Sequence, residues 1–159
     1  FAAMEVLAHT ERHAPISIGG FPTAGGGIVD AIEIPDLLSV LVAFDPNAQV
    51  TGLDRIAPDD RPPIAVTHLS FDAMVGSGTA LLAIALLWAV TVLRKRAERR
   101  PLLTLVALGG PLALVALEAG WFVTEFGRQP WIARGLLRTA DAVTTSPGLD
   151  ARFLGFSLI

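Results

Sequence analysis

The chain of 159 residues contains no cysteine and little charge, since only 17% of its residues are Asp, Glu, Lys or Arg. The absence of cysteine excludes disulfide bonds and thiolate metal sites within the chain. A formal net charge of −3 carries no basic footprint for nucleic acid, so we expect no such partner. Apolar side chains, in contrast, make up 52% of the residues, and the mean hydropathy is +0.58. This composition indicates a membrane protein.

Two long apolar stretches predict membrane-spanning helices. Residues 73–93 form one unbroken stretch of about 21 residues, which is the length that a helix needs to cross the hydrocarbon core. Residues 102–124 form a second stretch, in which Gly109-Gly110-Pro111 predicts a kink. A third apolar run begins at about residue 153. Because the chain starts at Phe1 rather than at Met and stops inside that run, we expect a piece of a longer protein.

The short segment between the two stretches is strongly basic. It contains five of the chain's twelve Lys and Arg residues, namely Arg94, Lys95, Arg96, Arg99 and Arg100. Basic loops between spans lie in the cytoplasm, so we expect residues 94–101 there. Residues 1–67 and about 131–150 would then lie outside, in the periplasm. The start of the first span and the end of the second would meet at that outer face.

Residues 1–67 predict an irregular extracytoplasmic loop. They hold nine carboxylates against three arginines and are interrupted by many prolines and glycines. Apolar spacing predicts short helices over residues 2–12 and 31–44, the second started by Pro35. The glycines at 25–27 lack the Lys-Ser/Thr ending of a phosphate loop. With residues 68–159 as the transmembrane region, the predicted fold is an all-α fragment of an integral membrane helical bundle.

Ionisable residues near the end of the second stretch are candidates for function, because charge at membrane depth is costly. Glu118, Trp121 and Glu125 are spaced i, i+3, i+7 and share one helix face, which suits an iron ligand, a proton relay or both. The alternative is a structural charge network that includes Arg128. The Arg128 guanidinium could equally bind a cofactor carboxylate, because its planar fork suits bidentate contacts.

Two methionines are present, and Met74 lies at the start of the first stretch. A thioether can ligate a haem iron, although a single Met in a helix is more commonly an ordinary apolar residue. Gly76 and Gly78 permit close approach of a flat macrocycle or of another helix, and helix packing is the commoner reason. His68 lies just outside the stretch, where it could be interfacial or belong to a proton exit or quinol site.

His9 and His13 are four residues apart in the loop, with Glu11 between them, and two histidines at this spacing could bind zinc. No third ligand follows at a recognisable spacing. A solvated segment is therefore the favoured interpretation of this group.

Several motifs resemble subunit I of cytochrome bd-type quinol oxidases, in the same order over most of the chain. The block GWFVTEFGRQPW, residues 120–131, is the most specific, and SFDAMVGSG, residues 70–78, resembles the family's SFxxMVGxG. Residues 1–22 resemble the second part of the family's periplasmic quinol loop, in its short form. Further family-like elements are Ile32-Glu33-Ile34-Pro35, Arg61-Pro62-Pro63 and LRTADAV at residues 137–143.

The resemblance implies haem-binding roles for residues of both spans. Met74 would be an axial ligand of a low-spin haem b, and Glu125 an axial ligand of a high-spin haem b. Trp121 would lie between haems. Arg128, with Gln129 of the same GRQPW block, would neighbour the haem propionates.

The resemblance also implies a quinol site in the loop. Glu5 matches a Glu implicated in quinol oxidation, and the Lys that accompanies it in the family would stand immediately before Phe1. Many members carry Arg two residues before the axial Met, where this chain has Asp72. An Asp cannot hold a haem propionate directly, so we expect different electrostatics around the low-spin haem.

A family member would be a multi-pass subunit of a bacterial inner membrane that oxidises quinol and reduces O₂ to water, building a proton-motive force without pumping. Its cofactors would be low-spin and high-spin haem b with haem d or a further haem b. Its partners would be subunit II, small accessory subunits and membrane lipid. The family's other haem ligands belong to N-terminal spans absent here, so this fragment alone would be inactive. Two alternatives stay open: a non-catalytic transporter or anchor fragment with a buried Glu/Arg network, or an inert truncated product.

Overall fold

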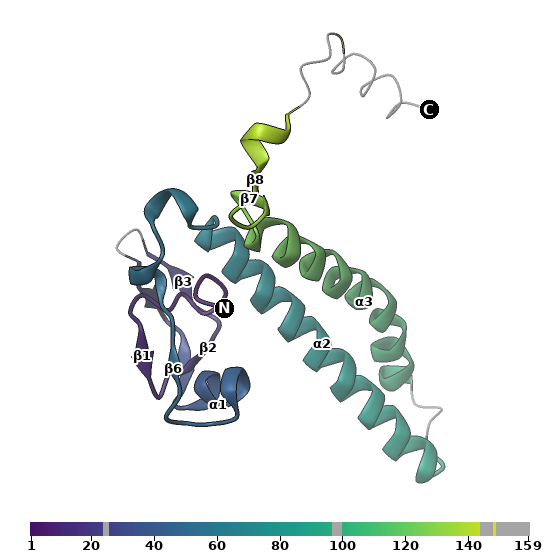
Figure 1. Ribbon diagram of the computed structural model, residues 1–159. Coiled ribbons are helices and arrows are strands. Elements are labelled where there is room, and N and C mark those ends of the chain that lie inside the picture. The colour runs from purple at the N-terminus through teal and green to yellow at the C-terminus, as the bar shows by residue number, and fades with distance from the viewer. Residues whose placement is uncertain (24–25, 97–99, 144–147, 149–159) are drawn as a thin grey trace.

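The computed structural model describes residues 1–23, 26–96, 100–143 and 148, and a helical hairpin dominates it (Figure 1). Helix α2 covers Ile64–Leu93 and helix α3 covers Arg100–Gly127. Both are long and apolar enough to cross a membrane, and only 6% and 11% of their most apolar windows are buried within the chain. Two helices that expose so much apolar surface fit lipid or a larger bundle. The prediction of a helical membrane fold is confirmed.

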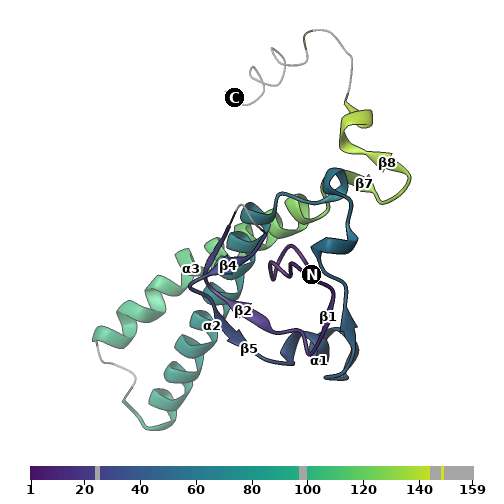
Figure 2. The same ribbon diagram turned by 90° about the vertical axis from the view of Figure 1, so that its left-hand side faces the viewer.

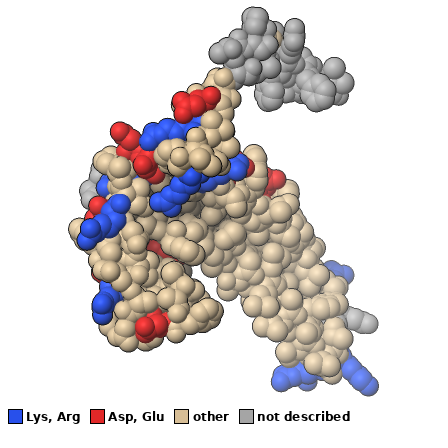
Figure 3. Space-filling model, viewed as in Figure 1, with Lys and Arg blue, Asp and Glu red and all other residues tan. Residues whose placement is uncertain are grey.

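The two ends of the hairpin differ in charge. At one end, Arg94–Arg96 follow α2 and Arg100 begins α3; we call this the basic end. At the other, which we call the loop end, α2 begins and α3 stops. Figure 3 shows basic side chains alone at the first, mixed acidic and basic side chains around the second, and an uncharged surface between them.

Helix α2 begins earlier than the sequence predicted, directly after Pro62-Pro63. The backbone N–H and the hydroxyl of Thr67 both donate to the Pro63 carbonyl, at 3.1 and 2.9 Å, and close the first turn. Proline suits this position because the first turn has backbone N–H groups without intrahelical partners. In α3, Pro111 lies inside the helix without ending it. The third predicted apolar run lies outside the described residues.

The helices approach each other through glycines of α3. Those that bring a neighbouring α2 side chain within 4 Å of an added Cβ atom are Gly109, Gly120 and Gly127. Their spacings, near three turns and two turns, keep them on one face of the helix. The tightest approach is at Gly120, where a Cβ atom would lie 3.2 Å from Met74 Sδ. Gly76 and Gly78 meet nothing within 4 Å, so they do not form this contact.

Residues 1–63, which we call the loop region, contain three two-stranded antiparallel pairs. They are β1 (Glu11–Arg12) with β6 (Gln49–Val50), β2 (Ile16–Ile18) with β5 (Ile32–Ile34), and β3 (Phe21–Pro22) with β4 (Ile28–Val29). Helix α1 (Leu37–Ala43) and 3-10 turns η1 (Leu53–Arg55) and η2 (Pro58–Asp60) complete it. After α3, β7 (Trp131–Ala133) pairs with β8 (Leu137–Arg138), and turn η3 (Thr139–Ala142) follows.

The loop region has its own small apolar core and lies beside the first part of α2 in both ribbon views (Figures 1 and 2). The buried members of this core are Ala2, Leu7, Ala14, Leu38, Val50 and Leu53. Ile64, the first residue of α2, packs against them and so joins the loop region to the hairpin.

Two helices predicted in the loop region differ from the structure. The predicted helix over residues 2–12 is wrong: a single turn ends at Val6, whose φ is +51°, and an extended segment follows. The carbonyls of Leu7 and Ala8 accept hydrogen bonds from Leu53 and Asp54, so long-range pairing replaces the helix. The predicted helix over residues 31–44 is restricted to α1, because Ile32–Ile34 pair with β2 as strand β5.

Candidate functional site

The chain after α3 is tied to the loop region by a short set of polar contacts. Gln129 Oε1 accepts a hydrogen bond from the Thr139 hydroxyl at 2.7 Å. The Arg138 guanidinium lies 4.7 Å from the centre of the Trp131 ring and donates to Asp60 Oδ1 at 2.5 Å. These contacts fix the GRQPW block above the loop end of the hairpin.

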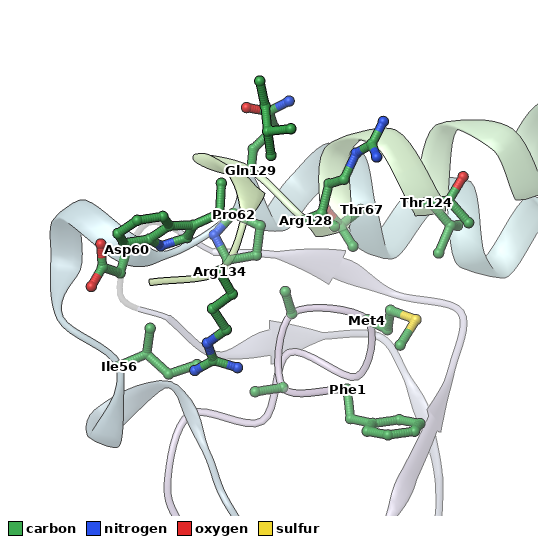
Figure 4. A pocket seen from close by; sticks show the side chains of 16 residues that line it. Phe1, Met4, Ile56, Asp60, Pro62, Thr67, Thr124, Arg128, Gln129 and Arg134 are labelled. Carbon is green, nitrogen blue, oxygen red and sulfur yellow. The ribbon is translucent and has the colours of Figure 1, made fainter. Parts of the chain in front are cut away.

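A cavity of about 610 Å³ opens where the N-terminal turn, η2 and the end of α3 meet (Figure 4). Its lining includes Phe1, Met4, Asp60, Arg128 and Arg134. Figure 4 shows Phe1 and Met4 on the loop-region side and Thr124 and Arg128 on α3, with the Arg128 side chain directed away from Phe1 and Met4 and the Arg134 side chain extending toward Ile56. The cavity therefore combines apolar walls with the guanidinium of Arg134, which suits a ligand with an apolar body and an anionic or acceptor edge.

Glu118, Trp121 and Glu125 lie along α3, as their spacing predicted, and their side chains do not face α2. Trp121 is 56% exposed in this chain, and Glu118 is exposed beside it. Glu125 is ion-paired with Arg128, one turn further on. Since Gly120 faces α2, Glu118 and Glu125 lie on the opposite side of α3 and Trp121 on its flank, where further protein or a cofactor could reach them.

Met74 lies on the α2 side of the same helix pair. It is half-buried, and its sulfur rests against Gly120 of α3. Glu125 is five residues nearer to the loop end, which is about 7.5 Å along the helix axis. The prediction that both residues lie toward one end of the hairpin is met, but α3 separates their side chains, so they do not share one pocket.

Glu5 is the only buried Asp or Glu among the described residues. Its side chain is in the N-terminal turn, with the whole residue 4% exposed, and its Oε2 accepts the Ser17 backbone N–H at 2.9 Å. The neighbouring residue Met4 contacts α2 through its carbonyl, which lies 2.5 Å from Nδ1 of His68. His68 is fully buried, and its Nε2 lies 3.3 Å from Asp72 Oδ2.

The surroundings of Glu5 change its acidity. Burial raises the pKa of the Glu5 carboxyl above its usual value, the Ser17 hydrogen bond and the charge of His68 lower it, and Asp72 raises it. A carboxyl held protonated to higher pH by burial can exchange a proton nearer to neutral pH, which is the property of a general acid or base.

Sequence reasoning placed His68 near the outer face without a partner and missed its pairing. The i, i+4 spacing of His68 and Asp72 was a readable signal, because such residues share one helix face. The contact between Met4 and His68 and the contact between Asp60 and Arg138 had no signal, since 64 and 78 residues separate the partners.

The zinc site that the spacing of His9 and His13 allowed, but did not favour, is not assembled. Glu11 belongs to strand β1, which separates His9 from His13, and His13 Nδ1 instead lies 2.6 Å from Asp36 Oδ1. Within residues 1–23, 26–96 and 100–143, no three His, Cys, Asp or Glu side chains gather as metal ligands would.

The donors available fit a haem as single axial ligands. Met74 offers one thioether and Glu125 one carboxylate, on separate sides of α3, and open space surrounds Gly76 and Gly78. Arg128 stands beside Glu125, where a guanidinium could also neutralise a haem carboxylate. A low-spin haem held by Met74 would need a second ligand from elsewhere, because the described residues bring no second donor to Met74.

Comparison with known proteins gives a consistent result. The family model for cytochrome bd terminal oxidase subunit I matches residues 1–159. A putative cytochrome bd menaquinol oxidase subunit I of Bacillus subtilis (strain 168) is 38% identical over 99% of this chain, and cytochrome bd-II ubiquinol oxidase subunit 1 of Escherichia coli (strain K12) is 41% identical over 85%. The chain covers 36% and 24% of these two relatives.

A solved structure shows the same fold. The bd oxidase from Geobacillus thermodenitrificans superposes with a TM-score of 0.82, at 41% sequence identity, over 99% of this chain and 37% of that one. The chain thus spans about a third, or less, of the length of the proteins that it matches.

Proposed function

Because the chain belongs to the cytochrome bd terminal oxidase subunit I family, we propose that it forms the C-terminal part of a quinol oxidase subunit. The whole protein would oxidise quinol at the outer face of a bacterial inner membrane and reduce O₂ to water. Quinol protons would leave on the outer side while protons for water come from the cytoplasm, so charge separation builds a proton-motive force without a pump. A second subunit, small accessory subunits and lipid would surround the exposed hairpin.

The observation that carries this proposal is the direct contact between the loop region and α2. The Met4 carbonyl binds His68, and Met74 lies six residues further along the same helix, about 9 Å along its axis. A quinol beside Glu5 would therefore lie close to an iron held by Met74. A haem bound there would supply one-electron redox chemistry between quinol and O₂.

The chain's own residues would divide the remaining work. Glu5 would accept a quinol proton, because its buried carboxyl has a raised pKa. Met74 would hold the low-spin haem b and Glu125 the high-spin haem b, with haem d or a further haem b at the oxygen site. Trp121, on the face of α3 that carries Glu125, would lie between haems, and Arg128 with Gln129 would neighbour propionates.

The first experiment is a reduced-minus-oxidised visible spectrum of the full-length complex, comparing wild type with Met74→Leu. We expect selective loss of the low-spin b signal and retention of the high-spin signals, since leucine has no donor atom. Met4→Leu, which changes the only other methionine, is the control and should keep all signals. An unchanged Met74→Leu spectrum would remove Met74 from the ligand set.

A second variant tests the other ligand. Glu125→Gln should lose a high-spin b signal, whereas Glu118→Gln, on the same helix face, should keep it. A wild-type complex without any haem signal would refute the oxidase proposal. It would favour the rival function, a transporter or anchor, for which the Glu125–Arg128 ion pair is the supporting observation.

A further inference from the structure

The cavity at the loop end has two main walls, which come from distant parts of the chain. The loop-region wall contains the N-terminal turn and residues near η2, namely Ile56, Asp60 and Pro62. The facing wall contains the end of α3 and residues that follow it, among them Trp131 and Arg134. The width of the cavity therefore depends on what holds these two segments together.

Each wall is braced by hydrogen bonds of its own. In the loop region, Arg61 Nε donates to the Ile56 carbonyl at 2.9 Å. After α3, Thr139 donates from its hydroxyl to Gln129 Oε1 at 2.7 Å and from its backbone N–H to the Pro130 carbonyl at 2.9 Å. These bonds preserve the shape of each wall, but none of them crosses the cavity.

The walls are joined on two sides. On the hairpin side, Gly127 of α3 lies so near to α2 that an added Cβ atom would be 3.5 Å from Thr67 Cγ2. On the other side, Arg138 Nη2 donates to Asp60 Oδ1 at 2.5 Å, and the same guanidinium lies 4.7 Å from the centre of the Trp131 ring. Of the hydrogen bonds between described residues, the one to Asp60 alone connects the loop region with the chain after α3.

Arg138 does not line the cavity, whereas both of its partners do, one on each wall. An arginine suits this place because a planar guanidinium can donate to a carboxylate in its plane while its face lies on an aromatic ring. Its side chain and that of Asp60 are 39% and 36% exposed, so the link is weak enough to open and close. Arg138 thus acts on the cavity only through Asp60 and Trp131.

We propose that Arg138 is a positioning residue for quinol: by holding Asp60 and Trp131 together, it keeps the two walls at the spacing that a quinol ring fills. This inference rests on the proposed function. Walls that are already in place spare the ligand the cost of ordering them, so loss of the link should weaken quinol binding rather than the chemistry.

Three features of the cavity fit a quinol. Its volume of about 610 Å³ is within the range of small-molecule pockets. The wall formed by residues 1–4 leads directly into Glu5, the residue proposed to accept the quinol proton. The Arg134 guanidinium supplies hydrogen-bond donors for a quinol oxygen, and Figure 4 shows it extending along the cavity toward Ile56.

The test is steady-state quinol oxidation by the full-length complex, with a short-chain ubiquinol and a short-chain menaquinol as substrates. In Arg138→Gln, we expect the KM for the quinol that the wild type oxidises to rise about two- to fivefold, which is the change in an equilibrium that one part-exposed ion pair supports. The kcat per haem should be unchanged, because saturating quinol restores the closed walls. A merely structural role would reduce the amount of assembled complex and leave the KM of that complex unchanged.

Two further variants sharpen this test. Arg138→Lys keeps a charge opposite Asp60 but loses the planar face over Trp131, so its KM should lie between those of wild type and Arg138→Gln. The matched control is Arg12→Gln, which removes an exposed arginine of β1 that does not line the cavity and should keep the wild-type KM. An unmoved KM in Arg138→Gln, or an equal rise in Arg12→Gln, overturns the proposal.

If Arg138→Gln does not assemble, the link is removed from its other end. Asp60→Asn should raise the KM, whereas Asp59→Asn, at an exposed neighbouring position outside the cavity lining, should not. Equal KM values for these two variants overturn the proposal. A wild-type complex without haem or quinol oxidation overturns the proposed function and this inference together, whereas an active wild type with an unmoved variant KM overturns this inference alone.

Discussion

The loop region and the hairpin are stabilised by different means, although one chain connects them. Apart from Leu102 and Ala119, the buried apolar residues of the described chain lie in the loop region, where Leu38 and Ala14 are 2% and 0% exposed. The hairpin buries 6% and 11% of its most apolar windows. A small apolar core, like that of a water-soluble domain, stabilises the loop region. The hairpin instead depends on the contact between α2 and α3 and on the lipid or protein around it.

This difference explains where the chemistry lies. The loop region can bury an acid such as Glu5 because strands and turns around it supply a backbone donor, Ser17 N–H. The hairpin presents Trp121 and Glu125 outward, where a cofactor and neighbouring helices of a larger subunit can reach them. His68 belongs to the hairpin but is buried by the loop region, so it joins the two.

The largest expected effect comes from a mutation that opens a cavity in the loop core, because it should destabilise the loop region and leave the hairpin unchanged. Leu38→Ala should destabilise the loop region by about 2–5 kcal/mol, because it removes buried methyl groups and leaves a void. Hydrogen exchange in the full-length complex should show lost protection in residues 1–63 with little change in α2 and α3. Leu41→Ala, on the same helix but at a 60% exposed position, is the control. Equal effects of the two variants would show that the core does not support this region.

The corresponding change in the hairpin is smaller. In Gly120→Ala the Cβ atom would crowd Met74 Sδ at 3.2 Å, which costs about 1–3 kcal/mol. The higher helix propensity of Ala offsets about 1 kcal/mol of this, so we expect a net loss of at most about 2 kcal/mol. We expect the low-spin haem signal of the complex to be lost at a lower temperature than in wild type. Gly110→Ala, where an added Cβ atom meets nothing within 4 Å, should have no such effect. A control that behaves like Gly120→Ala would argue against the Gly120–Met74 contact.

The pH dependence of loop stability tests the burial of Glu5. Its raised pKa means that the folded loop binds more protons than the unfolded one between the usual value of 4.5 and the raised value. The stability that depends on Glu5 is therefore full at low pH and decreases as pH rises through that window. Hydrogen exchange, corrected for intrinsic rates, should show this decrease in wild type and not in Glu5→Gln. A decrease that persists in the variant would have another source.

The smallest expected effect concerns the polar clamp between the regions. Arg138→Gln should cost less than about 1 kcal/mol, because its ion pair with Asp60 is part-exposed and screened, and its contact with Trp131 is of similar strength. A double-mutant cycle with Asp60→Asn, read by hydrogen exchange in residues 131–143, measures the coupling. Arg134→Gln serves as the control, and a zero coupling energy would mean that the ion pair does not hold the clamp.

Prediction from the sequence worked best where composition decides structure. The long apolar stretches became α2 and α3, and the basic segment between them lies at the end of the hairpin. It failed for residues 2–12, because backbone groups of Leu7 and Ala8 pair with residues more than forty positions away. The sequence motifs identified Met74, Glu125 and Glu5 as candidates, but they did not predict how these residues are arranged in space. Glu125 faces away from Met74, and Glu5 is linked to α2 through its neighbour Met4.

The sequence by itself determined the two apolar helices, the position of the basic segment and the family motifs around Met74 and Glu125. Hydropathy and spacing are local properties, so they can be read without coordinates. Only the tertiary structure decided that His68 is buried between Met4 and Asp72 and that the Glu5 carboxylate is buried against the Ser17 backbone N–H. Burial and charge pairing depend on contacts between distant segments, and no local pattern in the chain specifies which carbonyl will meet which ring.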